Sequence, residues 1–272
     1  MIQRQYSGVD KTLKKVLPTL FPELSYSEIF ALLRKKDVKV DGVRCCDAER
    51  VVSDGANITV YPRAAKRVKV LYEDEHLLAC YKPKGIASTG EGSFEDVVSA
   101  EKGAVTLLHR LDTNTDGVLL FAKDALTETE LIRSMKEGEI EKVYTAEVYG
   151  HPRVYTETSL RYYYKKNEEE KRAILSAEPR PGYIPVELTF KVVKEGEESS
   201  TLEVRLHRGK MHQIRAMLAH YGYFILGDGK YGDDTVNKRL GIKKHLLTAR
   251  AVIFRLPKES PLHYLNTLTI TI

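Results

Sequence analysis

The pattern of hydrophobic and polar residues predicts two short helices near the start of the chain. Apolar residues of the first helix recur at intervals of three and four: Val9, Leu13, Val16 and Leu17. Pro18 and Pro22 are expected to interrupt this helix. The second helix should begin at Ser25 or Ser27 and end in the basic run 34–36.

Short strands follow and complete a first unit. The segment VKVDGVRC (38–45) predicts two strands joined by a tight turn at Asp41–Gly42. A third strand, ANITVY, covers 56–61, and PRAAKR (62–67) is expected to be a linker. The order helix, helix, hairpin, strand predicts a small α+β domain over residues 1–63.

From residue 68 onward, segments that favour strands dominate. These segments are VKVLYED, HLLACYK, VTLLHRL, VLLFAK, VYTAEVYG, VELTFKVV, TLEVRLH, AVIFRL and NTLTITI. Helices are expected at 94–101, 127–137 and 211–221, with Thr127 and Glu130 as a capping box for the second. Short connections between successive strands predict an α+β domain over 68–272, built on a mixed, mostly antiparallel sheet. The biased segment 162–172 is expected to be an exposed hairpin or loop.

Charge divides the chain unevenly. The 272 residues carry a net charge of +5, and 42% of them are hydrophobic, which can supply a real core. Residues 1–67 contain 13 Lys+Arg and 8 Asp+Glu, whereas the rest contains 30 of each. A basic first quarter attached to a neutral remainder indicates either a binding surface for a polyanion or an ordinary solvated surface. Charge alone does not decide between these two interpretations.

Several classes of protein are disfavoured by what the sequence lacks. No apolar leader or run of about 20 apolar residues is present, so we expect a cytoplasmic protein that does not span a membrane. The cysteines Cys45, Cys46 and Cys80 include no CxxC spacing, so neither a zinc site nor a disulfide framework is expected. The sequence contains no phosphate loop or dinucleotide fingerprint either.

The segment HRLDTNTDG (109–117) first suggests a calcium loop. Asp112, Asn114 and Asp116 stand at the first, third and fifth positions, followed by Gly117. Such a loop needs a bidentate Glu at the twelfth position, where this chain has Lys123. The flanks also favour strands rather than helices, so a calcium site is not expected.

The same segment then divides into two parts. TNTDG has the composition of a tight turn between two apolar strands. On a strand ending before it, Arg110 and Asp112 alternate with Leu111 and would share one face. The residues alone leave open whether the two charges form a structural ion pair or include a reactive carboxylate.

Basic residues crowd the segment 208–215. Arg208, Lys210, His212 and Arg215 would lie in a loop and the first turn of a helix. A cation is not stabilised by the dipole at that end of a helix, so Arg215 suggests a carboxylate or phosphate partner. The alternative is a solvated basic face. For His212 alone, a hydrogen-bonded structural role is the default.

Four segments, in this order, resemble the motifs of RluA-type RNA pseudouridine synthases. They are LLACYKPKGIAS, HRLDTNTDGVLLFAK, EKVYTAEVYG and GKMHQIRAMLAHYGYFILGDGKYG. The first unit resembles the S4 RNA-binding domain that is often fused to these enzymes. The similarity covers nearly the whole chain, and four ordered motifs are far more specific than one.

The resemblance implies isomerisation of uridine to pseudouridine in RNA, without a cofactor or metal. It implies that Asp112 is the reactive carboxylate, although attack at C1′, addition at C6 and removal of the C2′ proton all stay open. Arg215 is the implied partner of Asp112, and Tyr144 would stack on the target base. Ile214 would line the pocket, and Arg110 would stack on or fill behind the flipped base.

Further positions are expected to contact the RNA. Lys142 and His212 fall in the matched motifs and are assigned to substrate binding. Contacts with the RNA backbone are expected from Lys14, Lys35, Lys36, Arg208 and Lys210.

The chain departs from the family pattern at a few positions. They are Asp116, Lys210, Met211 and Met217.

We expect a monomer that acts on ribosomal RNA, with transfer RNA as the second choice. The alternative function is a non-catalytic RNA-binding or ribosome-assembly protein on the same scaffold.

Overall fold

The computed structural model describes residues 1–24, 26–61, 68–154 and 156–272. The chain forms two compact units, Met1–Arg67 and Val68–Ile272. The expected linker 62–67 and the expected helix start at Ser25 lie outside the described residues. Within the described parts, no helix is long and apolar enough to cross a membrane.

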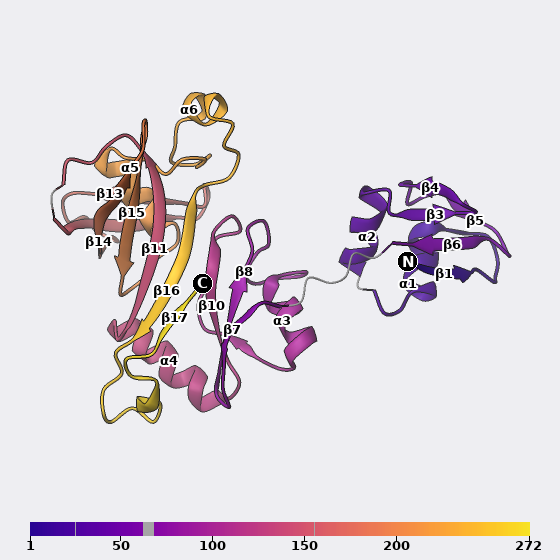
Figure 1. The fold of residues 1–272 in the computed structure, drawn as a ribbon, viewed down its shortest axis with the longest axis horizontal. Coiled ribbons are helices and arrows are strands. Elements are labelled where there is room, and N and C mark those ends of the chain that lie inside the picture. Colours follow the sequence, from indigo (N-terminus) through magenta and orange to yellow (C-terminus); the bar gives the residue numbers. More distant parts are fainter. Residues whose placement is uncertain (25, 62–67, 155) are drawn as a thin grey trace. The chain divides into compact units, whose positions relative to one another are not determined.

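The N-terminal unit combines a four-stranded sheet with two helices (Figure 1). Its elements are β1 (Ile2–Gln5), β2 (Lys11–Thr12), α1 (Leu13–Leu20), α2 (Tyr26–Arg34), β3 (Val38–Val40), β4 (Val43–Cys45), β5 (Val51–Val52) and β6 (Asn57–Val60). The sheet order is β1-β6-β3-β4, and β2 pairs separately with β5. The predicted hairpin is confirmed, because Asp41 and Gly42 have φ values of 49° and 79° between β3 and β4.

The first helix differs from its prediction at two positions. Val9 lies before the helix and is exposed, whereas Leu13, Val16 and Leu17 are buried as expected. Pro18 lies inside the helix instead of interrupting it. The proline removes one backbone hydrogen bond, but burial of the apolar face against the core retains the helical turn.

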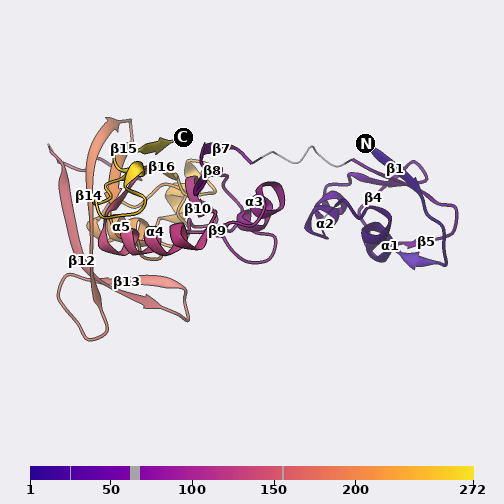
Figure 2. The same ribbon diagram turned by 90° about the horizontal axis from the view of Figure 1, so that it is seen from below.

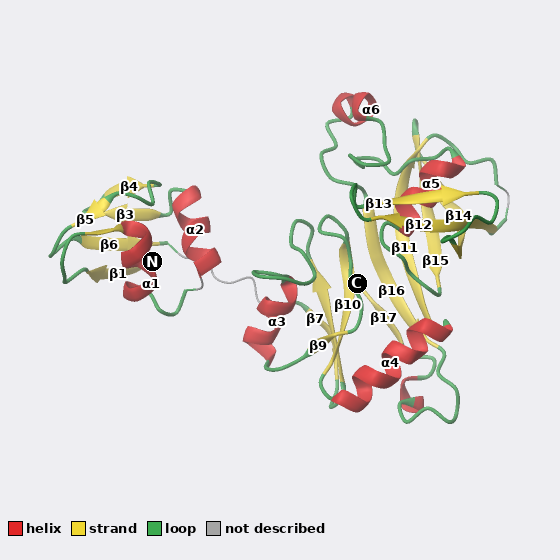
Figure 3. Cartoon of the chain, turned by 180° about the vertical axis from the view of Figure 1, so that it is seen from behind, coloured by secondary structure: helices red, strands yellow, loops and turns green. Residues whose placement is uncertain are grey.

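The C-terminal unit is built mainly from long strands, with the helices around them (Figure 3). Its elements are β7 (Val70–Glu73), β8 (Leu77–Lys82), α3 (Phe94–Lys102), β9 (Thr106–Leu107), β10 (Asp116–Ala122), α4 (Ala125–Glu137), β11 (Ile140–Tyr149), β12 (Thr158–Asn167), β13 (Arg172–Ser176), β14 (Ile184–Glu195), β15 (Ser199–Leu206), α5 (Gln213–Tyr221), α6 (Asp234–Arg239), β16 (Leu247–Phe254), a 3-10 turn (His263–Leu265) and β17 (Thr269–Thr271).

One sheet of eleven strands organises this unit. Its main path runs β13-β12-β14-β15-β11-β16-β10-β8-β7, with β17 on β16 and β9 on β10. The pair β10–β16 is parallel, while the pairs along the rest of this path are antiparallel. The predicted α+β class with a mixed, mostly antiparallel sheet is therefore confirmed. The segment 162–172 forms the hairpin of β12 and β13, which extends beyond the helices (Figure 2).

Both faces of the sheet are covered at the central strands β8, β10 and β16. Alternate residues of β8 enter different cores, Leu78 in one and Leu77 in the other. The first core includes residues of α3 and α5, and the second includes Leu131 and Met135 of α4. A strand that is apolar on both faces, such as VLLFA in β10, is the expected result.

Two local predictions in this unit are wrong. Only Thr106–Leu107 of the expected strand 105–111 is a strand, so Arg110 and Asp112 lie in an irregular segment. Helix α4 is capped by Asp124, whose side chain accepts a bond from the backbone N–H of Thr127. The carboxylate three residues earlier satisfies the helix start, so the Thr127–Glu130 capping box is not used.

Gly117 is required where β10 meets β16. Its φ is 122°, and a Cβ placed there would lie 2.0 Å from the backbone oxygen of Ala249. We expect Gly117→Ala to lower the free energy of unfolding of the C-terminal unit by about 3 kcal/mol, because it combines backbone strain with overpacking. Thermal and urea unfolding would measure this, with Gly209→Ala as control, since no heavy atom lies within 4 Å there. Equal effects of the two substitutions would contradict the prediction.

Candidate active site

A large open cleft in the C-terminal unit collects the predicted site residues of that unit. The cleft encloses about 2120 Å³. It is lined by all nine of them: Arg110, Asp112, Lys142, Tyr144, Arg208, Lys210, His212, Ile214 and Arg215. They come from strand β11, helix α5, and the segments before β10 and α5. Residues about 100 positions apart in the sequence thus share one surface.

The centre of the cleft is an ion-pair network around Arg215. Its Nη1 donates to Oδ2 of Asp112 at 2.7 Å. Its Nε and Nη2 donate to the two carboxylate oxygens of Asp228 at 2.7 and 2.8 Å. Asp228 is fully buried, whereas the side chain of Asp112 is 27% exposed toward the cleft. The predicted pairing of Asp112 with Arg215 is present in the structure.

The charges of this network stabilise one another. Burial of Asp228 would raise its pKa, but the bonds and charge of Arg215 outweigh burial and lower it. Burial likewise opposes the charge of Arg215, and Asp228 and Asp112 together raise the pKa of Arg215. A buried guanidinium with two carboxylate partners avoids the cost of an unpaired buried charge.

Asp228 was not assigned a role from the sequence. It lies in the quoted segment GDGKYG, and its Oδ1 also accepts from the backbone N–H groups of Lys230 and Tyr231 at 2.8 and 3.1 Å. An acid between two glycines indicates a turn, and nothing in the sequence pairs it with Arg215, 13 positions earlier. The available signal was the position of Arg215 at the start of a helix, which already suggested a carboxylate or phosphate partner and could have prompted a search for a second acid.

The segment that carries Asp112 is held by side chains instead of by strand pairing. Lys82 is fully buried, and its Nζ donates to the carbonyl oxygens of Asp112 and Thr115 at 3.2 and 2.8 Å. Ser88 Oγ accepts from the backbone N–H of Leu111 at 3.0 Å and donates to its carbonyl at 2.8 Å. Burial lowers the pKa of Lys82 to about 8. Both residues lie in the motif LLACYKPKGIAS, but neither was assigned a role from the sequence.

The two acids of DTNTDG have different partners. Asp112 accepts from Arg215, whereas Asp116 accepts from the hydroxyls of Tyr81 and Thr248, each at 2.7 Å. Asp116 is also absent from the residues that line the cleft. The carboxylate at 116 therefore fixes the start of β10 instead of facing the cleft.

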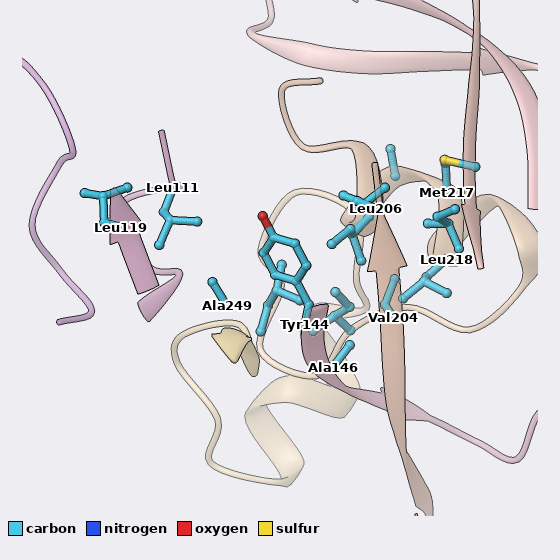
Figure 4. Packing of buried hydrophobic residues seen from close by; sticks show 14 of the residues in the cluster. Leu111, Leu119, Tyr144, Ala146, Val204, Leu206, Met217, Leu218 and Ala249 are labelled. Atoms are coloured by element: carbon cyan, nitrogen blue, oxygen red, sulfur yellow. The ribbon is translucent and has the colours of Figure 1, made fainter. Parts of the chain in front are cut away.

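Tyr144 and Ile214 form an apolar wall of the cleft that Asp112 also lines. Both are buried, and both belong to the core that includes Leu111 and Leu206. Figure 4 shows the ring of Tyr144 between Leu111 and Leu206, with its hydroxyl pointing away from Ala146. Burial, and to a smaller extent the negative charge of Asp112, raises the pKa of Tyr144, so the phenol is neutral.

The cationic lining varies in exposure. Arg110 is exposed at the cleft, as are Arg208 and Lys210. Lys142 is buried, and burial lowers its pKa to about 8. His212 Nε2 lies 3.9 Å from Oδ2 of Asp112, and burial lowers the pKa of His212. The cleft therefore places several cations around one partly exposed carboxylate.

The lysines of the N-terminal unit that are predicted to contact the RNA backbone lie on the surface of that unit. Lys14 forms an ion pair with Glu49, and its side chain is 39% exposed. Lys35 and Lys36 are exposed at the carboxyl end of α2, where cations are favoured by the helix dipole.

Comparison with known proteins identifies the family. Residues 76–220, which are more than half of the chain, match the model of the RNA pseudouridylate synthase family. The chain belongs to this family. The ribosomal large subunit pseudouridine synthase C of Buchnera aphidicola subsp. Acyrthosiphon pisum is 30% identical to this chain over 228 residues. The match covers 74% of this chain and 70% of that protein. The protein of the same name in Rickettsia conorii is 28% identical over 84% of each chain.

Solved structures show the same fold. The human RNA pseudouridylate synthase domain containing 4 covers 75% of the synthase with a TM-score of 0.59 and 21% identity, and 87% of that chain is matched. The human RNA pseudouridylate synthase domain containing 1 covers 78%, with a TM-score of 0.61, 18% identity and 92% of that chain matched. The family match and the named relatives confirm the resemblance to RluA-type synthases found in the sequence.

The departures from the family pattern have different surroundings. Met217 is fully buried in the core, so it packs and does not face the cleft. Asp116 is bound to Tyr81 and Thr248, as described above. Lys210 and Met211 line the cleft, and the backbone N–H of Lys210 donates to Gln213 at 2.9 Å.

The role of Asp228 predicts a pH-dependent stability difference. Because its folded pKa lies below the ordinary value of 3.8, its contribution is present above that pH and is lost as pH falls through the folded pKa. We expect Asp228→Asn to cost about 3 kcal/mol at pH 7, since it leaves buried Arg215 short of a charged partner. Urea unfolding should show that the gap from wild type narrows below about pH 4. A gap that is the same at pH 7 and pH 3 would rule out this role.

Proposed function

We propose that the synthase isomerises uridine in the RNA of the large ribosomal subunit, with Asp112 as the reacting carboxylate. The observation that carries this proposal is the ion pair of Asp112 in the cleft: Arg215 bonds to the carboxylate of Asp112, and buried Asp228 fixes Arg215. A permanently charged guanidinium held on its far side by another acid presents Asp112 in one orientation. Pre-organised charge of this kind is what a reaction at a nucleotide requires.

The reaction rearranges one nucleotide. The bond from N1 to C1′ of uridine breaks, the uracil turns, and a bond from C5 to C1′ forms, while C5 loses a proton and N1 gains one. There is no net oxidation or reduction and no group leaves, so a carboxylate with suitable neighbours is sufficient. Asp112 would act at C1′, at C6 or on the C2′ proton.

The apolar wall supplies a place for the base. Tyr144 is buried next to Asp112 and stays neutral, so its ring can pack on a flat uracil. Ile214 lines the same cleft. Arg110 is exposed at the rim, where its guanidinium plane can stack on a flipped base or fill the space that the base leaves.

The N-terminal unit would contribute affinity. It carries the whole net excess of positive charge, and Lys35 and Lys36 are exposed at one end of α2. We assign it as an RNA-binding domain of the S4 type over residues 1–63. Arg208 and Lys210, at the cleft, would hold phosphates near the reacting nucleotide.

The choice of ribosomal RNA rests on relatives. The proteins of Buchnera aphidicola and Rickettsia conorii described above are named ribosomal large subunit pseudouridine synthases. Transfer RNA is the other substrate to be tested.

Removal of the carboxylate should abolish product without abolishing binding. We expect Asp112→Asn to lower pseudouridine formation on the order of a thousandfold or more, because the amide is neither a nucleophile nor a base. Pseudouridine mapping of ribosomal and transfer RNA from cells with the wild-type or variant gene would measure this and name the substrate. Asp234→Asn, at an exposed position of α6, is the matched control. Near-normal turnover by Asp112→Asn would refute the assignment.

Lys35 and Lys36, which directly follow α2, should govern the affinity for RNA and its dependence on salt. We expect the double substitution Lys35→Gln, Lys36→Gln to weaken RNA binding and to reduce the slope of log affinity against log salt by up to about 1.4, at about 0.7 per lost phosphate contact. Filter binding over a salt series would measure both values, with exposed Lys258→Gln as control. An unchanged slope would show that these lysines do not hold phosphates.

A further inference from the structure

Tyr231 links the active-site cleft to the hairpin of β12 and β13. Its hydroxyl accepts from the backbone N–H of Ala173, in β13, at 2.6 Å. The guanidinium groups of Arg172 and Arg215 lie 5.2 and 5.4 Å from the centre of its ring. The same hydroxyl lies 3.1 Å from Nδ1 of His212. One side chain therefore contacts the hairpin, Arg215 and the histidine that faces Asp112.

The hydrogen-bond pattern assigns the tautomer of His212. The Ala173 N–H occupies a lone pair of the Tyr231 oxygen, and the hydroxyl still has one proton to donate. Within the described parts of the chain, Nδ1 of His212 is the acceptor in reach of that proton. Nδ1 then accepts, so a neutral imidazole carries its proton on Nε2.

The ring is directed at Asp112 by an uncommon backbone conformation. His212 has φ 56° and ψ 17° at the start of α5, in the left-handed region that residues with a Cβ seldom occupy. Such strain persists where surrounding structure holds it, often at functional sites. It leaves Nε2 3.9 Å from Oδ2 of Asp112, a separation that can shorten when substrate closes the site.

The charges around His212 are balanced. Asp112 and Asp228 favour the imidazolium, whereas Arg215 and Lys230 oppose it. Burial is the largest influence and lowers the pKa of His212, which favours the neutral ring. A neutral donor can orient the carboxylate without adding a second cation to the one that Arg215 already supplies.

We propose that Tyr231 and His212 are positioning residues: Tyr231 holds His212 in the tautomer that presents Nε2–H to Asp112. Through Ala173, the β12–β13 hairpin holds Tyr231. Lys230 strengthens this attachment by donating to the carbonyl oxygens of Glu170 and Lys171 at 3.3 and 2.8 Å. The benefit to catalysis rests on the proposed role of Asp112, but the tautomer itself can be measured without RNA.

Nitrogen-15 NMR of histidine-labelled, full-length protein tests the tautomer directly. The His212 signals are identified by their loss in His212→Gln. Wild type should show protonated Nε2 and unprotonated Nδ1 at pH 7, and Tyr231→Phe should show a mixture of both tautomers, because the ring stays but the hydroxyl is removed. Tyr72→Phe, which removes a hydroxyl bonded to Asp74 outside the cleft, should leave the signals unchanged. Protonated Nδ1 in wild type, or an unchanged tautomer in Tyr231→Phe, would overturn the proposal.

Kinetics test the consequence for Asp112. Tyr231→Phe should lower kcat for pseudouridine formation about tenfold with KM within about twofold, whereas Tyr72→Phe should change neither. His212→Gln, which can still offer an N–H, should retain more activity than His212→Leu. Adding Tyr231→Phe to His212→Leu should cause little further loss, since the shared pathway is already absent. Fully additive losses of activity in the double variant, or equal activity of the two His212 variants, would refute the positioning of Asp112 by His212 and Tyr231. Inactive wild type with the expected tautomer would instead count against the proposed function.

Discussion

The site depends on one buried guanidinium. Arg215 joins two acids, one fully buried and one open to the cleft, so its geometry is set from inside the protein. A charge in that position would be unstable without Asp228, and Asp112 would lack a fixed partner without Arg215. The network also explains why α5 and the segment before β10, which are distant in sequence, have to meet.

Support for Asp112 comes from polar groups that replace regular strand pairing. Lys82 binds carbonyl oxygens of the segment, and Ser88 satisfies both backbone groups of Leu111. An irregular segment can place a side chain where a strand would not, but its backbone groups still need partners. Gly117 then lets β10 approach β16 directly after the turn. Rigidity around the carboxylate therefore arises from a few buried polar side chains and one glycine.

In the function that we propose, the charges of the two units have different roles. The net positive charge of the chain falls within residues 1–67, where exposed cations such as Lys35 and Lys36 act over a distance and are screened by salt. In the cleft, Arg215 is in close contact with one buried and one partly buried acid, where screening is weak. General attraction for a polyanion and local control of one carboxylate are therefore separate properties of the chain.

Local patterns in the sequence determined the two-residue hairpin at Asp41–Gly42, most strands and helices, and the α+β class. The resemblance of four ordered motifs to RluA-type synthases indicated the family and singled out Asp112, Tyr144 and Arg215. These follow from side-chain periodicity, turn chemistry and ordered motifs, all of which are short-range. Only the tertiary structure showed that the Asp112 segment is not a strand, that Asp228 completes the network and that Tyr231 contacts His212. Those facts depend on hydrogen bonds between residues far apart in the chain, and no local pattern of polar and apolar residues encodes such partners.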